Sequence, residues 1–190
     1  TIDQVDREVE RGAVLIDTRP VEDFAHGHLA GSISVSLTGR FSEQSGSVIP
    51  TDAPIVLVGD PDTAIEAKVR LGRIGFDDVI GAVDAIGTIA MHPDRASRLS
   101  RLTADEFEVR RAELGDRLQL IDVRNAGEVA GSPVEGARNI PLSRLREQLG
   151  DLDPRQPVVL VCAGGARSGI ANSLLRAEGF ADVSDLLGGA

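Results

Sequence analysis

Four short motifs occur twice in this chain, in the same order and at nearly the same separation. The paired motifs begin at Val14 and Gln119, Gly31 and Gly136, Pro54 and Pro157, and Gly75 and Gly179. Their offsets all lie between 103 and 105 residues. Because a nearly constant offset over four motifs indicates a duplicated structural unit, we predict two copies of one domain, at 1–95 and 96–190.

Each copy alternates short apolar runs with stretches of helical spacing. In the first copy this pattern predicts strands at 14–16, 33–35, 55–58 and 79–80, with helices at 2–12 and 64–74. In the second copy it predicts strands at 118–121, 137–140, 158–161 and 183–186, with helices at 103–114, 143–149 and 168–178. The alternation favours an α/β fold in which helices flank a mainly parallel sheet. Residues 91–98 are polar, include a proline and are expected to form a surface linker.

Composition excludes several classes of partner. The chain has 20 Lys and Arg against 30 Asp and Glu, so its net charge of −10 disfavours nucleic acid and anionic membranes. No apolar run approaches the roughly 20 residues that span a bilayer. One cysteine forms no internal disulfide and fits a reducing cytoplasm. Three histidines without paired spacing provide no metal site, and no cofactor is expected.

The only cysteine, Cys162, directly follows the apolar run 158–161 and opens a glycine-rich loop. Backbone N–H groups of this loop and a following helix N-terminus, which carries roughly +0.5 charge, favour a thiolate or a terminal persulfide on that cysteine. Arg167 adds a fixed positive charge to the loop. Ser168 is either the N-cap of the following helix or a direct partner of the sulfur. The predicted binding loop, 162–168, comprises Cys162, Ala163, Gly164, Gly165, Ala166, Arg167 and Ser168.

This loop, followed by a helix, by Gly179-Phe-x-x-Val and by Leu187-Gly-Gly, resembles the active-site region of the rhodanese family. The stretch Gly27-His-Leu-Ala-Gly31 resembles an early part of the same family. The resemblance implies two tandem rhodanese-like domains and a sulfurtransferase that carries sulfane sulfur as a persulfide on Cys162. Its partners would be a small sulfur donor, either a low-molecular-weight persulfide or thiosulfate, and a thiol acceptor. Ala163 stands where many members have a basic residue, which favours the persulfide over thiosulfate.

The first copy lacks these chemical groups. Gly59 occupies the position of the cysteine, and the loop after it, 60–63, has two acidic residues, a proline and no arginine. Acidic side chains repel an anion and proline has no backbone donor, so we predict that the first domain is catalytically inactive. Asp122 and Arg124 are expected to be structural, with the arginine pairing with a nearby acid such as Glu128.

Three alternatives stay open. The first is a non-catalytic sulfur carrier or docking module. The other two are a phosphatase and an arsenate reductase built on the same loop. The four residues between Cys162 and Arg167 argue against the last two, because the phosphatase relatives have five. A longer resemblance around 70–81 is to proteins that fuse a metallo-β-lactamase-fold domain to rhodanese modules, some of which are persulfide dioxygenases. It implies a fused or partner metallo-hydrolase domain.

Overall fold

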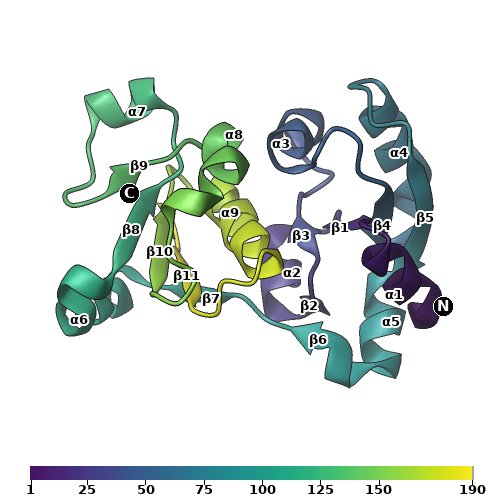
Figure 1. The fold of residues 1–190 in the computed structure, drawn as a ribbon, viewed down its shortest axis with the longest axis horizontal. Coiled ribbons are helices and arrows are strands. Elements are labelled where there is room, and N and C mark those ends of the chain that lie inside the picture. Colours follow the sequence, from purple (N-terminus) through teal and green to yellow (C-terminus); the bar gives the residue numbers. More distant parts are fainter. Residues whose placement is uncertain (190) are drawn as a thin grey trace. The chain divides into compact units, whose positions relative to one another are not determined.

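The computed structural model describes residues 1–189 and divides into two compact units, Thr1–Arg98 and Leu99–Ala190 (Figure 1). Each unit contains its own parallel sheet with helices around it. This arrangement confirms the predicted α/β fold with two tandem domains. The units are described separately below.

The first unit has a four-stranded sheet in the order β3-β1-β4-β5, with every neighbouring pair parallel. The strands are β1 (Val14–Asp17), β3 (Ile33–Ser34), β4 (Ile55–Gly59) and β5 (Val79–Asp84). The helices are α1 (Ile2–Glu10), α2 (Val21–His26), α3 (Phe41–Val48), α4 (Ala64–Gly72) and α5 (Ala85–Met91). The sequence predicts a turn or short helix at 19–24, where α2 forms, but it predicts neither α3 nor α5.

The second unit has a five-stranded parallel sheet in the order β7-β11-β10-β8-β9. Its strands are β7 (Ser100–Leu102), β8 (Gln119–Asp122), β9 (Arg138–Asn139), β10 (Val158–Val161) and β11 (Val183–Leu186). Its helices are α6 (Ala104–Leu114), α7 (Ala126–Gly131), α8 (Leu142–Leu145) and α9 (Ala166–Ala177). Thr103 and Glu106 form a capping box at the start of α6.

The central strands β4 and β10 are buried along their whole length, as their unbroken apolar sequences predict. Each lies beside a strand that ends in Leu-Ile-Asp, at 15–17 in β1 and at 120–122 in β8. In this register Val58 pairs with Asp17 and Val161 pairs with Asp122. Burying one such aliphatic side chain contributes about 1.5–3 kcal/mol. The two central strands therefore fix the place in each sheet where the following loop begins.

The segment predicted as a surface linker, 91–98, belongs instead to the first unit. Within it, β6 (Ala96–Ser97) pairs antiparallel with β2 (His28–Leu29). Arg95 forms two hydrogen bonds of 2.6 and 2.7 Å with Asp6 on α1. The linker prediction is wrong because strand pairing and this ion pair order a segment whose polar composition and proline are typical of irregular structure.

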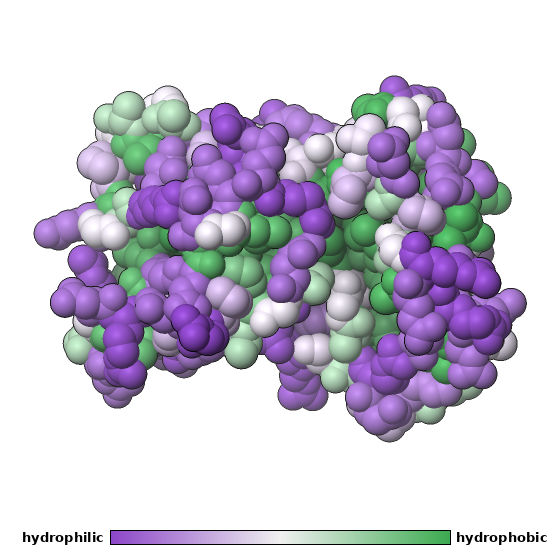
Figure 2. Space-filling model, in the orientation of Figure 1, coloured by the Kyte–Doolittle hydropathy of each residue, from purple (hydrophilic) through white to green (hydrophobic). Residues whose placement is uncertain are grey.

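Among residues 1–189, most of the exposed large hydrophobic side chains belong to the first unit. They include Ile65 and Val69 on α4, Ile74 just after it and Ile80 on the edge strand β5. Figure 2 shows hydrophobic residues at the surface of this part of the first unit. In the second unit the corresponding strand, β11, is buried and covered by β7. Within residues 1–189, no helix is long and apolar enough to cross a membrane.

Candidate active site

The thiol of Cys162 lies just beyond β10, with the residue only 1% exposed. Two backbone N–H groups donate to its Sγ, from Gly165 at 3.1 Å and from Ser168 at 3.4 Å. Loop residues Ala163 and Gly164 are exposed above this buried sulfur. Because both donors point at the sulfur, the loop is arranged to stabilise negative charge there.

The loop turns tightly because Gly165 is in the left-handed region, with φ +83°, and caps α9. The helix therefore begins at Ala166, two residues earlier than predicted. A second glycine, Gly189, has the same φ of +83° and lies against the Cys162–Ala163 backbone. A side chain at position 189 would overlap that backbone, so the Gly-Gly turn after β11 packs directly under the loop.

Ser168 contacts the thiol through its side chain as well as its backbone. Its Oγ lies 3.4 Å from the Cys162 Sγ, and the residue is fully buried within α9. The prediction that Ser168 is a helix N-cap is wrong, because Gly165 takes that position. The alternative, a direct contact with the sulfur, matches the geometry.

Arg167 does not donate to the sulfur in this structure. Its guanidinium makes two 2.7 Å hydrogen bonds with both carboxylate oxygens of Glu128 on α7. Arg167, together with a backbone hydrogen bond from Asn125, lowers the pKa of Glu128 to about 2. The sequence predicts that Arg167 adds positive charge to the loop, and the carboxylate of Glu128 offsets much of that charge. Arg167 still interacts electrostatically with Cys162.

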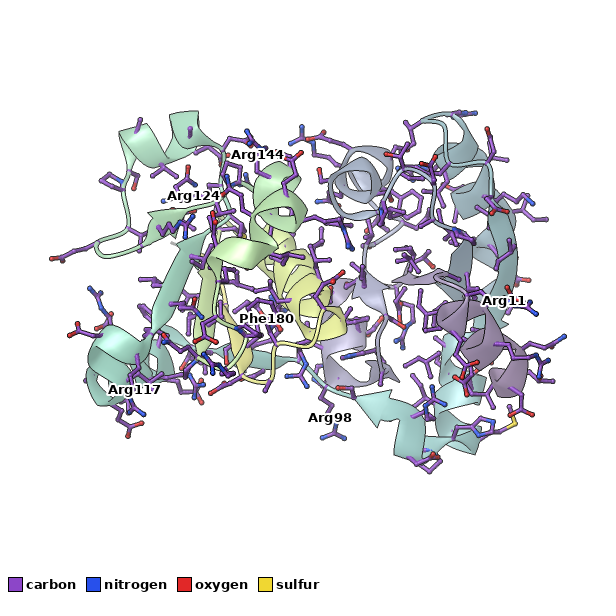
Figure 3. All side chains as sticks on the ribbon, viewed as in Figure 1. Arg11, Arg98, Arg117, Arg124, Arg144 and Phe180 are labelled. Atoms are coloured by element: carbon purple, nitrogen blue, oxygen red, sulfur yellow. The ribbon has the colours of Figure 1, made fainter. Side chains whose placement is uncertain are left out.

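Glu128 was expected to pair with Arg124, and this expectation is wrong. Arg124 instead donates to Asp122, from Nε at 3.0 Å and from Nη2 at 2.6 Å, and also to the Ser132 carbonyl at 2.8 Å. Figure 3 shows Arg124 on the side of the second unit that carries α7 and α8. The local aspartate competes successfully for the arginine because it lies only two residues away and is buried with it.

The first unit has an ion pair equivalent to that of Arg124 and Asp122, but it has no cysteine. Arg19 donates to Asp17 at 2.6 Å and to the Gly27 carbonyl at 2.9 Å, as Arg124 does in the second unit. Gly59 stands at the cysteine position, and a Cβ there would overlap the Oγ1 of Thr18. The hydroxyl of Thr18 therefore fills the space that a cysteine side chain needs.

Three residues behind the loop were missed by the sequence analysis. Asp185 on β11 is fully buried and lies near Ser168, with Oδ2 at 3.4 Å from its Oγ. Arg101 on β7 and Asn172 on α9 hydrogen bond to the same carboxylate. A signal was available, because an aspartate inside the predicted strand 183–186 needs a partner if that strand is buried.

Comparison with known proteins identifies the family. A model of the rhodanese-like domain matches residues 1–84 and again 103–190. The chain belongs to this family, as two consecutive domains. Relatives of the family include sulfurtransferases.

Three relatives illustrate the range of similar proteins. An uncharacterised protein, YqhL of Bacillus subtilis, is 37% identical over 113 residues, covering 58% of this chain and 85% of that protein. The thiosulfate sulfurtransferase GlpE of Shewanella oneidensis is 33% identical over 72 residues, covering 38% of this chain and 71% of that protein. An adenylyltransferase and sulfurtransferase of Zea mays is 34% identical, covering 47% of this chain but only 20% of that protein.

Proposed function

We propose that this protein is a sulfurtransferase that carries sulfane sulfur on Cys162 and delivers it to a thiol. The observation that carries the proposal is the convergence of the Gly165 and Ser168 N–H groups on the Cys162 sulfur. Family membership and the named sulfurtransferases among its relatives support the same reaction class. The first domain, which has Gly59 in place of the thiol, is proposed to be catalytically inactive.

The reaction consists of two displacements at sulfur. The Cys162 thiolate attacks the outer sulfur of a donor persulfide, forming a new S–S bond while the donor leaves as a thiolate. An acceptor thiolate then attacks the outer sulfur of the resulting persulfide, and Cys162 leaves as a thiolate. Each step conserves charge and needs no oxidant or reductant. The loop N–H groups stabilise the anion in both states.

The donor is proposed to be a low-molecular-weight persulfide rather than thiosulfate. Ala163 adds no positive charge at the exposed rim of the loop, and Arg167 is paired with Glu128. A doubly charged donor therefore meets little attraction in a chain of net charge −10. The same pairing of Arg167 disfavours a phosphatase or arsenate reductase, because the guanidinium donates to Glu128 and not to the cysteine.

Intact-mass measurement tests the proposal. After incubation with glutathione persulfide, the full chain is expected to gain the mass of one sulfur atom and to lose it on addition of cyanide. Cys162→Ser is expected to gain none, whereas Ser100→Ala, a control away from the thiol, gains it normally. Sulfur uptake by Cys162→Ser at the wild-type rate would contradict the proposal. Uptake without turnover to a thiol acceptor would support the carrier alternative, which includes service to a fused or partner metallo-hydrolase domain.

A further inference from the structure

Behind the loop, buried polar groups connect Cys162 to a carboxylate on the neighbouring strand. The Sγ of Cys162 lies 3.4 Å from the Oγ of Ser168, which lies 3.4 Å from Oδ2 of Asp185. All three residues are buried, with exposed fractions of 0 to 1%. The thiol therefore has a continuous route of exchangeable protons to a carboxylate without crossing solvent.

The carboxylate is held in place from two further sides. Arg101 donates to Oδ2 of Asp185, from Nε at 3.1 Å and from Nη2 at 3.0 Å, while Asn172 donates to Oδ1 at 3.1 Å. The same Nη2 of Arg101 also donates to the carbonyl of Gly165 at 3.2 Å. One ion pair thus fixes both the acceptor of the Ser168 hydroxyl and the glycine that caps α9.

Asp185 is suited to receiving a proton. Burial raises its pKa, against the opposing effects of Arg101, Asn172 and Ser168. The other charged groups near the thiol are Arg167, which is paired with Glu128, and Asp122, which is paired with Arg124. Asp185 is also paired, with Arg101, but its Oδ2 in addition accepts from the Ser168 hydroxyl that contacts the sulfur, which gives it a side-chain route to the thiol.

We propose that Asp185 is a positioning residue that acts through Ser168 to remove the proton of the Cys162 thiol. The S–H bond breaks as its proton passes to the Ser168 oxygen, and the hydroxyl proton of Ser168 passes to Oδ2 of Asp185. Thiol and carboxylate become thiolate and carboxylic acid, so charge is conserved and no redox step occurs. This inference rests on the proposed function only in taking Cys162 as the reactive group.

The first unit has no equivalent of this route. Asp185 pairs with Leu160 on the central strand, and the residue that pairs with Leu57 in the first unit is Ala82. In the first unit, Gly59 therefore stands in place of the thiol and Ala82 in place of the carboxylate. This series of polar side chains is therefore found in the unit that has the cysteine, and the shared fold does not require it.

The rate of alkylation by iodoacetamide as a function of pH, followed by intact mass on the full chain, tests this inference. Asp185→Asn is expected to move the midpoint of the rate profile up by about one pH unit, which is on the order of a tenfold lower rate below the midpoint. Ser168→Ala, which keeps the Asp185–Arg101 pair, is expected to give the same shift. The double variant is expected to shift no further, because both residues belong to one route.

Asp182→Asn serves as the control, since the side chain of Asp182 is half exposed and pairs with Arg110. A purely structural role for Asp185 would lower the maximal rate and leave the midpoint in place. A downward shift in Asp185→Asn would show instead that its negative charge repels the thiolate. Either result overturns the inference. Because alkylation needs no sulfur donor, failure of sulfur uptake alone would contradict the proposed function and leave this inference standing.

Discussion

The loops after β4 and β10 begin at the same position of two similar sheets and have opposite chemistry. Each follows a buried central strand that pairs in parallel with the Leu-Ile-Asp strand. After β10 the backbone N–H groups converge on a buried sulfur, whereas after β4 the side chain of Asp60 accepts the N–H of Asp62. The sheet therefore sets where such a loop lies, while the residues of the loop decide what it can bind.

The difference extends to what lies under each loop. In the first unit Thr18 occupies the space next to Gly59, and a cavity of about 550 Å³ beside them includes Asp60 and Glu66 in its lining. In the second unit Val123 takes the place of Thr18, and Arg101 supports the loop from β7. Among residues 1–189, no strand covers β5 as β7 covers β11. The loop after β4 thus lacks the supporting strand as well as the thiol.

Among the variants proposed here, substitution of Gly189 is expected to have the largest effect on sulfur uptake by the loop after β10. Alanine at φ +83° carries about 1–2 kcal/mol of strain, and its Cβ also overlaps the Cys162–Ala163 backbone. Gly189→Ala is therefore expected to displace the loop and abolish sulfur uptake. Gly188→Ala is the matched control, since its φ is +76° but a Cβ there meets no atom within 4 Å. Equal loss of uptake in both variants would show that strain alone, rather than contact with the loop, is responsible.

Much of the architecture could be predicted from the sequence because the determining signals are local or repeated. The unbroken run 158–161 predicted a buried central strand, and the glycines after Cys162 predicted a tight turn. The partner of Arg167 could not be predicted in this way, because Glu128 is 39 residues away and its position depends on how α7 packs. The partners of Asp185 could not be predicted for the same reason, since they come from β7 and α9.

Introducing a thiol into the first unit is expected to have an intermediate effect. In a Cys162→Ser background, Gly59→Cys is expected to lower the free energy of unfolding by about 1–3 kcal/mol, because its side chain overlaps Thr18. Adding Thr18→Ala is expected to recover part of that loss in urea denaturation, and Thr18→Ala alone provides the reference. Neither variant is expected to gain sulfur, since Pro61 has no N–H and Asp60 repels an anion. Uptake at a rate near that of Cys162 would refute the assignment of the first loop as inactive.

The smallest effect is expected at the ion pair that neutralises Arg167. Glu128→Gln removes its charged partner and leaves the guanidinium to act on the Cys162 sulfur, so alkylation at pH 7 is expected to rise about twofold to fivefold.

The same variant has a defined pH signature. The pKa of Glu128 is lowered to about 2 in the folded protein, so its stabilising contribution is present above the unfolded value of about 4.3 and is lost as pH falls towards 2. Thermal unfolding between these pH values is expected to show this loss in the wild type and less of it in Glu128→Gln. Glu147→Gln, which breaks the exposed pair with Arg144, is the control and should leave the alkylation rate unchanged. An unchanged rate in Glu128→Gln as well would mean that Arg167 contributes no field at the thiol, so that the backbone donors and Ser168 account for the difference between the two loops.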